Sequence, residues 1–244
     1  MKASQKLIPF GGMTKKARKA LGLRMCPDIG LWALDNGLGN CKWKTEACKD
    51  CYNWKMIIYP DTKKAWSPGG LDDQRWENCE SKAFKGLSRV RLNTRGEAFP
   101  DVEQVQRVGQ WIKDNPNTKF WIVTRAHQTG MPTYKANTKL IEAIEAHVMC
   151  HDNAKVMASL DEQTEHLWPS LKARGWNTIY YHRRNKAPEY NQDKQANMHK
   201  CRKTWEIRTN PETNRPVHLK GVCKTCRNGC FSDNRVDVRL KYHQ

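Results

Sequence analysis

Strand-like and helix-like segments alternate along residues 89–182, and this alternation restricts the fold more than any other feature. Strands joined by helices through short connections form a parallel sheet with right-handed crossovers. The sequence therefore predicts an α/β fold. The expected strands, rich in β-branched and aromatic residues, are 89–94, 119–124, 155–160 and 177–181, and the expected helices, with apolar residues at helical spacing, are 101–113, 138–148 and 164–174.

Local signals support two of these helix boundaries and one earlier strand. Asp101 stands where an N-cap residue is expected, and Gly175 stands where a helix commonly ends. The apolar stretch 29–34 predicts a first strand, followed by a glycine-rich loop. The chain thus contains four to five βα units, fewer than the eight of a complete barrel, which predicts a partial (βα) barrel.

Three regions follow from this pattern. Residues 1–24 form a basic N-terminal arm, residues 25–182 form the α/β core with a cysteine-containing loop, and residues 183–244 form a basic, irregular, cysteine-rich extension. Within the core, residues 52–59 predict a short helix, and residues 61–85 predict an irregular insertion rich in glycine, proline and tryptophan.

The charge of the chain indicates a polyanionic partner. Lysine and arginine number 43 against 25 acidic residues, a net charge of +18 over 244 residues. Residues 1–24 contain seven basic residues and no acidic residue, and residues 183–230 contain twelve basic and four acidic residues. Basic ends around a balanced centre favour contact with nucleic acid or another polyanion, although surface lysines also serve solubility alone.

The sequence shows no membrane span and no export signal. It contains no apolar run of 18 residues, and its N-terminus lacks a continuous apolar segment. We therefore expect no membrane partner and a cytoplasmic location. In that compartment the ten cysteines are metal ligands or buried thiols rather than disulfides.

The first cysteine cluster follows the first expected strand, where a parallel α/β sheet carries its chemistry. It consists of Cys41, Cys48 and Cys51, with Cys26 upstream. A C-x2-C pair brings two thiolates onto one metal centre without strain. The long gap between Cys41 and Cys48 suits an iron–sulfur cluster better than a tetrahedral zinc site.

A second cluster lies in the C-terminal extension and consists of Cys201, Cys223, Cys226 and Cys230. This region has little apolar material, so a bound metal would supply folding energy that a core cannot. Either zinc or a second iron–sulfur cluster fits these four sulfurs.

Polar side chains follow the expected strands at the edge where an open parallel sheet binds ligands. His182 is the residue of this set best suited by type to proton transfer. The sequence contains no P-loop, no G-x-S-x-G motif and no zinc-hydrolase histidine spacing. The strand-end residues are Glu97, Thr124, Arg125, Ser159, Asp161 and His182.

This order of motifs resembles that of the radical SAM enzymes, and more specifically of the phage-encoded gene-product-88-like proteins, a small cysteine-rich family. The resemblance runs from about Cys26 to the end of the chain. The residues that carry it are Cys41-x6-Cys48-x2-Cys51-Tyr52, Arg91-x4-Gly96-Glu97-x-Phe99, Phe120-Trp-Ile-Val-Thr-Arg125 and Cys223-x2-Cys226-x3-Cys230.

The resemblance implies one or two [4Fe–4S] clusters and S-adenosylmethionine as cofactors. Cys41, Cys48 and Cys51 would bind a cluster, and the pair Gly96-Glu97 would contact the methionine amino group. From their positions at strand ends, Thr124, Arg125 and Ser159 are expected to line the cofactor site as well. The enzyme would then cleave S-adenosylmethionine reductively, in the host cytoplasm, on an unknown and nucleic-acid-related substrate.

The sequence also departs from the radical SAM pattern. The cysteine spacing is C-x6-C-x2-C instead of C-x3-C-x2-C, and one Gly-Glu replaces Gly-Gly-Glu. Cys26 as a fourth ligand would close the cluster to substrate. The alternative hypothesis is therefore a non-enzymatic iron–sulfur or zinc protein that binds nucleic acid or the host transcription machinery.

Overall fold

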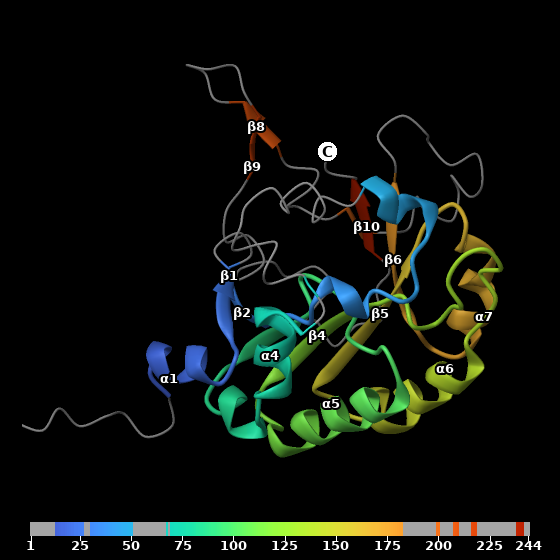
Figure 1. Cartoon of the computed structure of the whole chain (residues 1–244). Coiled ribbons are helices and arrows are strands. Elements are labelled where there is room, and N and C mark those ends of the chain that lie inside the picture. Colours follow the sequence, from blue (N-terminus) through green and yellow to red (C-terminus); the bar gives the residue numbers. More distant parts are fainter. Residues whose placement is uncertain are drawn as a thin grey trace, which may run out of the picture.

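The protein is built around an eight-stranded mixed β-sheet, with strand order β1-β2-β3-β4-β5-β6-β10-β7 (Figure 1). The computed structural model describes residues 13–26, 30–50, 67, 69–182, 199–200, 207–209, 216–218 and 238–241. The strands of the sheet are β1 (Arg24–Cys26), β2 (Leu31–Leu34), β3 (Arg89–Leu92), β4 (Lys119–Thr124), β5 (Ala154–Leu160), β6 (Asn177–His182), β7 (His199–Lys200) and β10 (Val238–Lys241). A separate hairpin pairs β8 (Ile207–Thr209) with β9 (Pro216–His218).

The strands from β2 to β6 are parallel, and each pairs with the next one along the chain. Only β1 runs antiparallel to its neighbour within this sheet, among the pairings described. This sequential order is what strand–helix–strand units joined by short connections produce. The structure thus confirms the α/β class.

Helices and tighter turns connect the strands. The α-helices are α1 (Lys15–Ala20), α4 (Leu71–Glu77), α5 (Val102–Asp114), α6 (Thr138–Ile144) and α7 (Trp168–Ala173). The shorter elements are η1 (Leu38–Asn40), η2 (Glu46–Asp50), η4 (Ser81–Phe84), η5 (Glu145–Met149), which continues α6 as a π-helical turn, and η6 (Glu165–Leu167).

The predicted strands and helices of the region 89–182 are confirmed, with small shifts at their ends. The Asp101 carboxylate accepts a hydrogen bond from the backbone N–H of Gln104 at 3.0 Å and so caps α5 as expected. Gly175 has a positive φ of 82°, as a glycine after a helix does. The segment 164–174 is helical, but its first turn is the 3-10 turn η6.

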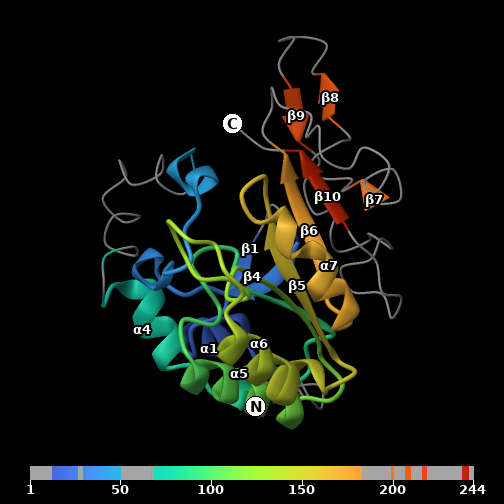
Figure 2. The ribbon, with the colours of Figure 1, turned by 90° about the vertical axis from the view of Figure 1, so that its right-hand side faces the viewer.

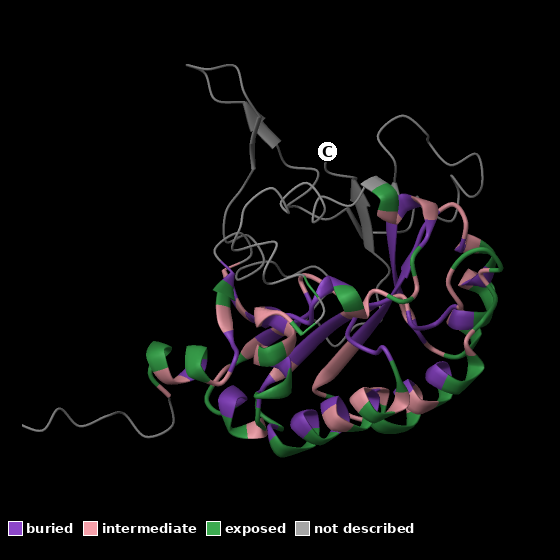
Figure 3. Cartoon of the chain, viewed as in Figure 1, coloured by how far each residue is buried: buried purple, intermediate pink, exposed green. Residues whose placement is uncertain are grey.

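The two faces of the sheet differ. Alternate strand residues such as Phe120 and Ile122 join the large core formed with α5, α6 and α7, whereas Trp121 belongs to a smaller apolar cluster on the other face. Figures 1 and 2 show these three helices along the same face of the sheet. Figure 3 shows the buried residues concentrated between that face and the helices. The helices therefore cover one face, while the smaller apolar cluster on the other face is buried without them.

The prediction that residues 61–85 are irregular is wrong where the structure describes them. This stretch contains α4 and η4, and their residues Trp76 and Phe84 are fully buried in the large core. Each element is too short to show a helical period in the sequence. Burial of large aromatic side chains stabilises them instead.

The two ends of the described chain also contain more regular structure than the sequence predicts. The basic arm includes α1, which had no apolar periodicity to reveal it. The C-terminal extension is not wholly irregular, because β10 pairs in parallel with β6 and so extends the core sheet. The predicted helix at 52–59 lies outside the described residues.

Among the described residues, no helix combines the length and apolar character that crossing a bilayer requires.

Candidate functional site

Polar and charged side chains meet at the carboxyl ends of β2, β3, β4 and β5. Parallel strands bring their carboxyl ends to one edge of a sheet, and ligands of α/β proteins bind at that edge. The loop that contains Cys41 and Cys48 follows β2 and reaches across this edge. Its contacts with the loops after β3, β4 and β5 define the candidate site.

Glu97, in the loop after β3, is the central buried carboxylate of the site. Its side chain is only 5% exposed, and it accepts hydrogen bonds from the Thr124 hydroxyl at 2.5 Å and the backbone N–H of Arg125 at 2.9 Å. Burial raises the pKa of Glu97, although these hydrogen bonds act in the opposite direction. Glu97 therefore fastens the loop after β3 to the end of β4.

Arg125 and Asp161 form an ion pair that joins the ends of β4 and β5. The Arg125 guanidinium lies 2.8 Å from the Asp161 carboxylate. Burial alone would raise the pKa of Asp161, but Arg125 and the Thr45 hydroxyl hold it below its usual value. The Thr45 hydroxyl donates its single proton to Asp161 at 2.6 Å. Asp161 thus ties the cysteine loop to the sheet.

The sulfur of Cys48 lies within this network. The backbone N–H of Thr45 donates to it at 3.4 Å, and the Thr45 hydroxyl oxygen lies 3.8 Å away. Because the hydroxyl proton of Thr45 is already donated to Asp161, a protonated Cys48 would be the donor in the second contact. Burial disfavours the charged form of Arg125, but the Asp161 carboxylate beside it holds the pKa of Arg125 above its usual value.

Other contacts hold the rest of the cysteine loop in place. The Trp43 indole donates to the carbonyl of Phe99 at 3.3 Å, and the Gln128 amide donates to the carbonyl of Trp43 at 3.2 Å. The backbone N–H of Met131 donates to the carbonyl of Lys44 at 3.3 Å. The loop is therefore held by segments that follow both β3 and β4.

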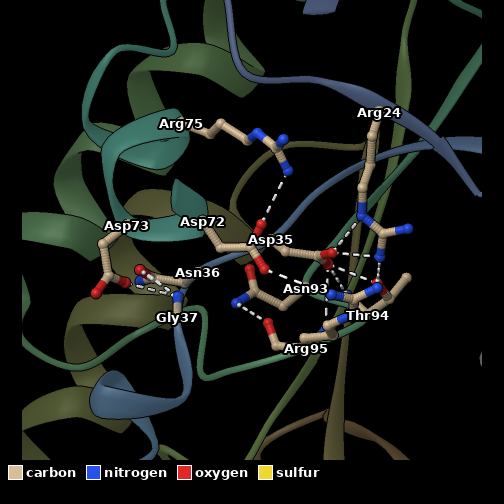
Figure 4. A network of polar contacts seen from close by, with 10 residues as sticks. All are labelled: Arg24, Asp35, Asn36, Gly37, Asp72, Asp73, Arg75, Asn93, Thr94 and Arg95. Atoms are coloured by element: carbon tan, nitrogen blue, oxygen red, sulfur yellow. Dashed lines mark hydrogen bonds and ion pairs between the residues drawn. The ribbon is translucent and has the colours of Figure 1, made fainter. Parts of the chain in front are cut away.

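A second polar network holds the turn that precedes Glu97 (Figure 4). Asp35, at the end of β2, accepts hydrogen bonds from Arg24 Nε at 2.6 Å and from the backbone N–H of Thr94 at 2.7 Å. Gly96 has a φ of +76°, and a Cβ atom there would lie 2.1 Å from the carbonyl oxygen of Asn36. Glycine at position 96 thus allows the loops after β2 and β3 to touch.

The structure brings together several residues that the sequence predicted for the site. Glu97, Thr124 and Arg125 contact one another, and through Asp161 and Thr45 they reach Cys48. Ser159 is buried two residues before Asp161, on the sheet face away from the helices. Cys41 is half-buried on the same loop as Cys48.

Several predicted site residues lie outside the described part of the chain. His182 ends β6, but its side chain is not among the described groups. Cys51 and the four cysteines of the C-terminal extension, Cys201, Cys223, Cys226 and Cys230, are outside it altogether. Within the described residues, no three potential metal-ligating side chains come together.

Sequence reasoning missed Thr45 and Asp35 as parts of this site. A threonine three residues before a cysteine is a weak local signal, because such hydroxyl groups commonly bond to nearby backbone or side-chain atoms. Asp35 gave no signal of its own, since its partners Arg24 and Thr94 are distant in the sequence.

No protein-family model matches the chain, and neither the curated proteins nor the solved structures contain a significant match. The function is therefore argued from the residues and geometry of the site.

Proposed function

We propose that this chain is an iron–sulfur protein of the radical SAM kind, with a [4Fe–4S] cluster on Cys41, Cys48 and Cys51. One observation carries the proposal. The sulfur of Cys48 is hydrogen-bonded into the buried network that joins Glu97, Arg125 and Asp161 at the strand ends. A cysteine that served only packing would not need a charged network around it.

The sulfur of Cys48 accepts a hydrogen bond from the backbone N–H of Thr45. Such a donor would stabilise a thiolate ligand, and hydrogen bonds to ligating sulfurs tune iron–sulfur clusters. The loop also contacts three other loops, as the residues that support a metal site do. The hydrogen bond on Cys48 and these loop contacts support a metal centre at this position.

The strand arrangement supports a partial barrel. The parallel strands β2 to β6 follow one another in order, and α5, α6 and α7 cover one face. The open face and the carboxyl ends of the strands would then enclose the site, as in larger (βα) barrels.

When bound, a [4Fe–4S] cluster supplies the electron for reductive cleavage of S-adenosylmethionine. The residues of this chain would orient and shield the reactants. Glu97 would receive the methionine amino group, although that group would have to share carboxylate oxygens that already accept bonds from Thr124 and Arg125. Arg125, fixed by Asp161, would offset negative charge at this edge of the sheet.

The position of Cys26 favours a cluster with an open coordination position. Cys26 pairs with Leu31 at the amino end of β2, whereas the cysteine loop begins beyond Leu34 at the carboxyl end. These two ends are about 10 Å apart along the strand. In Figures 1 and 2, β1 lies well away from η2, the turn that contains Cys48. Cys26 is thus poorly placed to be a fourth ligand.

We further propose that Cys201, Cys223, Cys226 and Cys230 hold a second centre, either zinc or iron–sulfur. The support for this site is the sequence alone, through the density of sulfur ligands in a segment that is poor in apolar residues.

The metal content of cysteine variants tests the first site. Protein purified without oxygen should be brown and contain iron and acid-labile sulfide. Cys48→Ala should lose one cluster's absorbance and iron. Cys150→Ala is the matched control, because Cys150 is exposed and distant in sequence from both clusters. Equal iron in both variants and the parent protein would contradict the proposal.

A second experiment separates the enzyme from a metal-containing binding protein. Reduced, cluster-containing protein should release methionine from S-adenosylmethionine, and Glu97→Gln should lose binding of that cofactor while it keeps its iron. If the iron is present but no cleavage or cofactor binding is found, the alternative of a non-enzymatic iron–sulfur protein is correct.

A further inference from the structure

The helix α1 presents a cluster of lysines to solvent. Lys15, Lys16 and Lys19 are exposed, and Arg18 is the one basic residue of this helix that is buried. The described segment 13–26 contains no acidic residue. Some lysines elsewhere in the described chain are instead paired with a carboxylate, as Lys82 is with Glu80 at 2.6 Å.

Arg18 determines how this helix is held. Its guanidinium donates to the carbonyl oxygens of Ala83 and Lys85, the second at 2.7 Å, and lies 5.9 Å from the centre of the Trp32 ring. These contacts fix α1 against η4 and β2. Because Arg18 points inward, the three lysines of α1 remain on the solvent side. Lys85 is also exposed, and its backbone lies next to α1 through the hydrogen bond that its carbonyl accepts from Arg18.

This basic surface, formed by Lys15, Lys16, Lys19 and Lys85, is separate from the candidate site. Lys85 lies just before β3, at the amino ends of the parallel strands. The cysteine loop lies at their carboxyl ends. Any role of this surface therefore does not depend on a metal cluster.

We propose that the basic surface binds the phosphate backbone of nucleic acid without sequence specificity. Clustered lysines on one helix, in a segment (13–26) that contains no acidic residue, provide the positive charge that phosphate contacts require. A membrane is a poorer partner, because helices that bind bilayers also insert an apolar face, and the large exposed apolar side chains among the described residues are Met25 and Met131, neither of them on α1.

Salt-dependent binding to a fluorescent DNA duplex of mixed sequence tests this proposal. The variant Lys15→Gln/Lys16→Gln/Lys19→Gln should bind about tenfold or more weakly at low salt. The slope of log affinity against log salt should fall by about 0.9 for each phosphate that the variant no longer neutralises. The matching triple Lys→Arg variant, which keeps the charge, should bind like the parent protein.

The control removes three charges elsewhere. Lys113, Lys135 and Lys139 are exposed on α5, on the loop before α6 and on α6. The variant with all three of these lysines changed to Gln should keep most of the affinity for the DNA duplex and most of the salt slope. Equal weakening in the two Gln variants would show an effect of net charge alone and overturn the proposal, as would failure of the parent protein to bind the duplex. If the Lys15→Gln/Lys16→Gln/Lys19→Gln variant bound anionic phospholipid vesicles more weakly than the parent protein but bound DNA equally well, the surface would be assigned to a membrane and the proposal would be overturned. Iron content should be the same in all variants, so this result is independent of the proposed cluster.

Discussion

Gly96 adopts a backbone conformation that favours glycine at a point where two loops touch. Its φ is +76°, and a Cβ atom would collide with the Asn36 carbonyl. The left-handed conformation favours glycine, and the close approach leaves no space for a Cβ atom unless the loops shift. The glycine of the Gly-Glu pair thus has a structural role that precedes any contact with a ligand.

Gly96→Ala should lower the free energy of unfolding by more than about 2 kcal/mol, since strain and a backbone clash add. Gly69→Ala is a matched control, because Gly69 has a similar φ of +70° but open space around its Cα. The free energy of unfolding of Gly69→Ala should be only about 1 kcal/mol lower than that of the parent protein. Urea unfolding measures both, and similar losses would show that the clash is relieved by a shift of the loop.

His127 is a buried histidine that the structure keeps neutral. Burial first, and the positive charge of Arg125 second, lower its pKa from 6.5 to about 3. The folded state therefore does not take up the proton that the unfolded chain binds below pH 6.5. The stability that this residue supports is complete above pH 6.5 and is lost progressively as the pH falls toward 3.

Between pH 6.5 and 5, His127 should cost the folded state up to about 2 kcal/mol, since each pH unit corresponds to about 1.4 kcal/mol. His127→Leu should remove this part of the pH dependence, measured as the difference in unfolding free energy at the two pH values. His147→Gln, a change at an exposed histidine, should leave it in place. Persistence of the full pH dependence in His127→Leu would assign it to other groups.

The helix α5 shows how a single residue can set the start of an element. Asp101 has an extended backbone, and its side chain caps the first turn through the N–H of Gln104. Its charge also interacts favourably with the positive end of the helix. This cap, together with the apolar residues on the buried side of α5, made the helix predictable from sequence.

Asp101→Ala should lower the free energy of unfolding by about 1 kcal/mol, the usual value of an N-cap side chain. Asp101→Asn keeps the acceptor oxygen, so its free energy of unfolding should fall by only a few tenths of a kcal/mol. Thermal or urea unfolding gives both values. If the two variants lose the same amount, then charge rather than the hydrogen bond supplies the stabilisation.

The sheet has a large core on the face that the helices cover and a smaller buried apolar cluster on the face that they do not cover. Ile122 is fully buried on the helix side, and its neighbour Val123 packs at the edge of the smaller cluster. Neighbouring residues of one strand thus belong to different parts of the protein.

Ile122→Ala should lower the free energy of unfolding by about 2 to 5 kcal/mol, because it leaves a cavity in the large core. Val123→Ala removes fewer methyl groups from a partly exposed position and should lose less than half as much. Denaturant unfolding of both variants tests this difference. Equal losses of unfolding free energy in the two variants would show that the smaller cluster around Val123 is packed as tightly as the large core.

The sequence alone predicted every parallel strand from β2 to β6 and the long helices between them. The regular spacing of apolar residues is a local property, so it can be read without knowledge of the fold. The same holds for the cap at Asp101. The short elements α1, α4 and η4 could not be predicted, because contacts such as those of Arg18 and Trp76 stabilise them.

The tertiary structure decided which of these residues meet. Glu97, Arg125, Asp161 and Thr45 come from four different loops, and only the parallel arrangement of the strands brings them to one edge. The sheet likewise carries Cys26 away from Cys48 and adds β10 beside β6. Such contacts join residues far apart in the chain, and no local pattern encodes their distance.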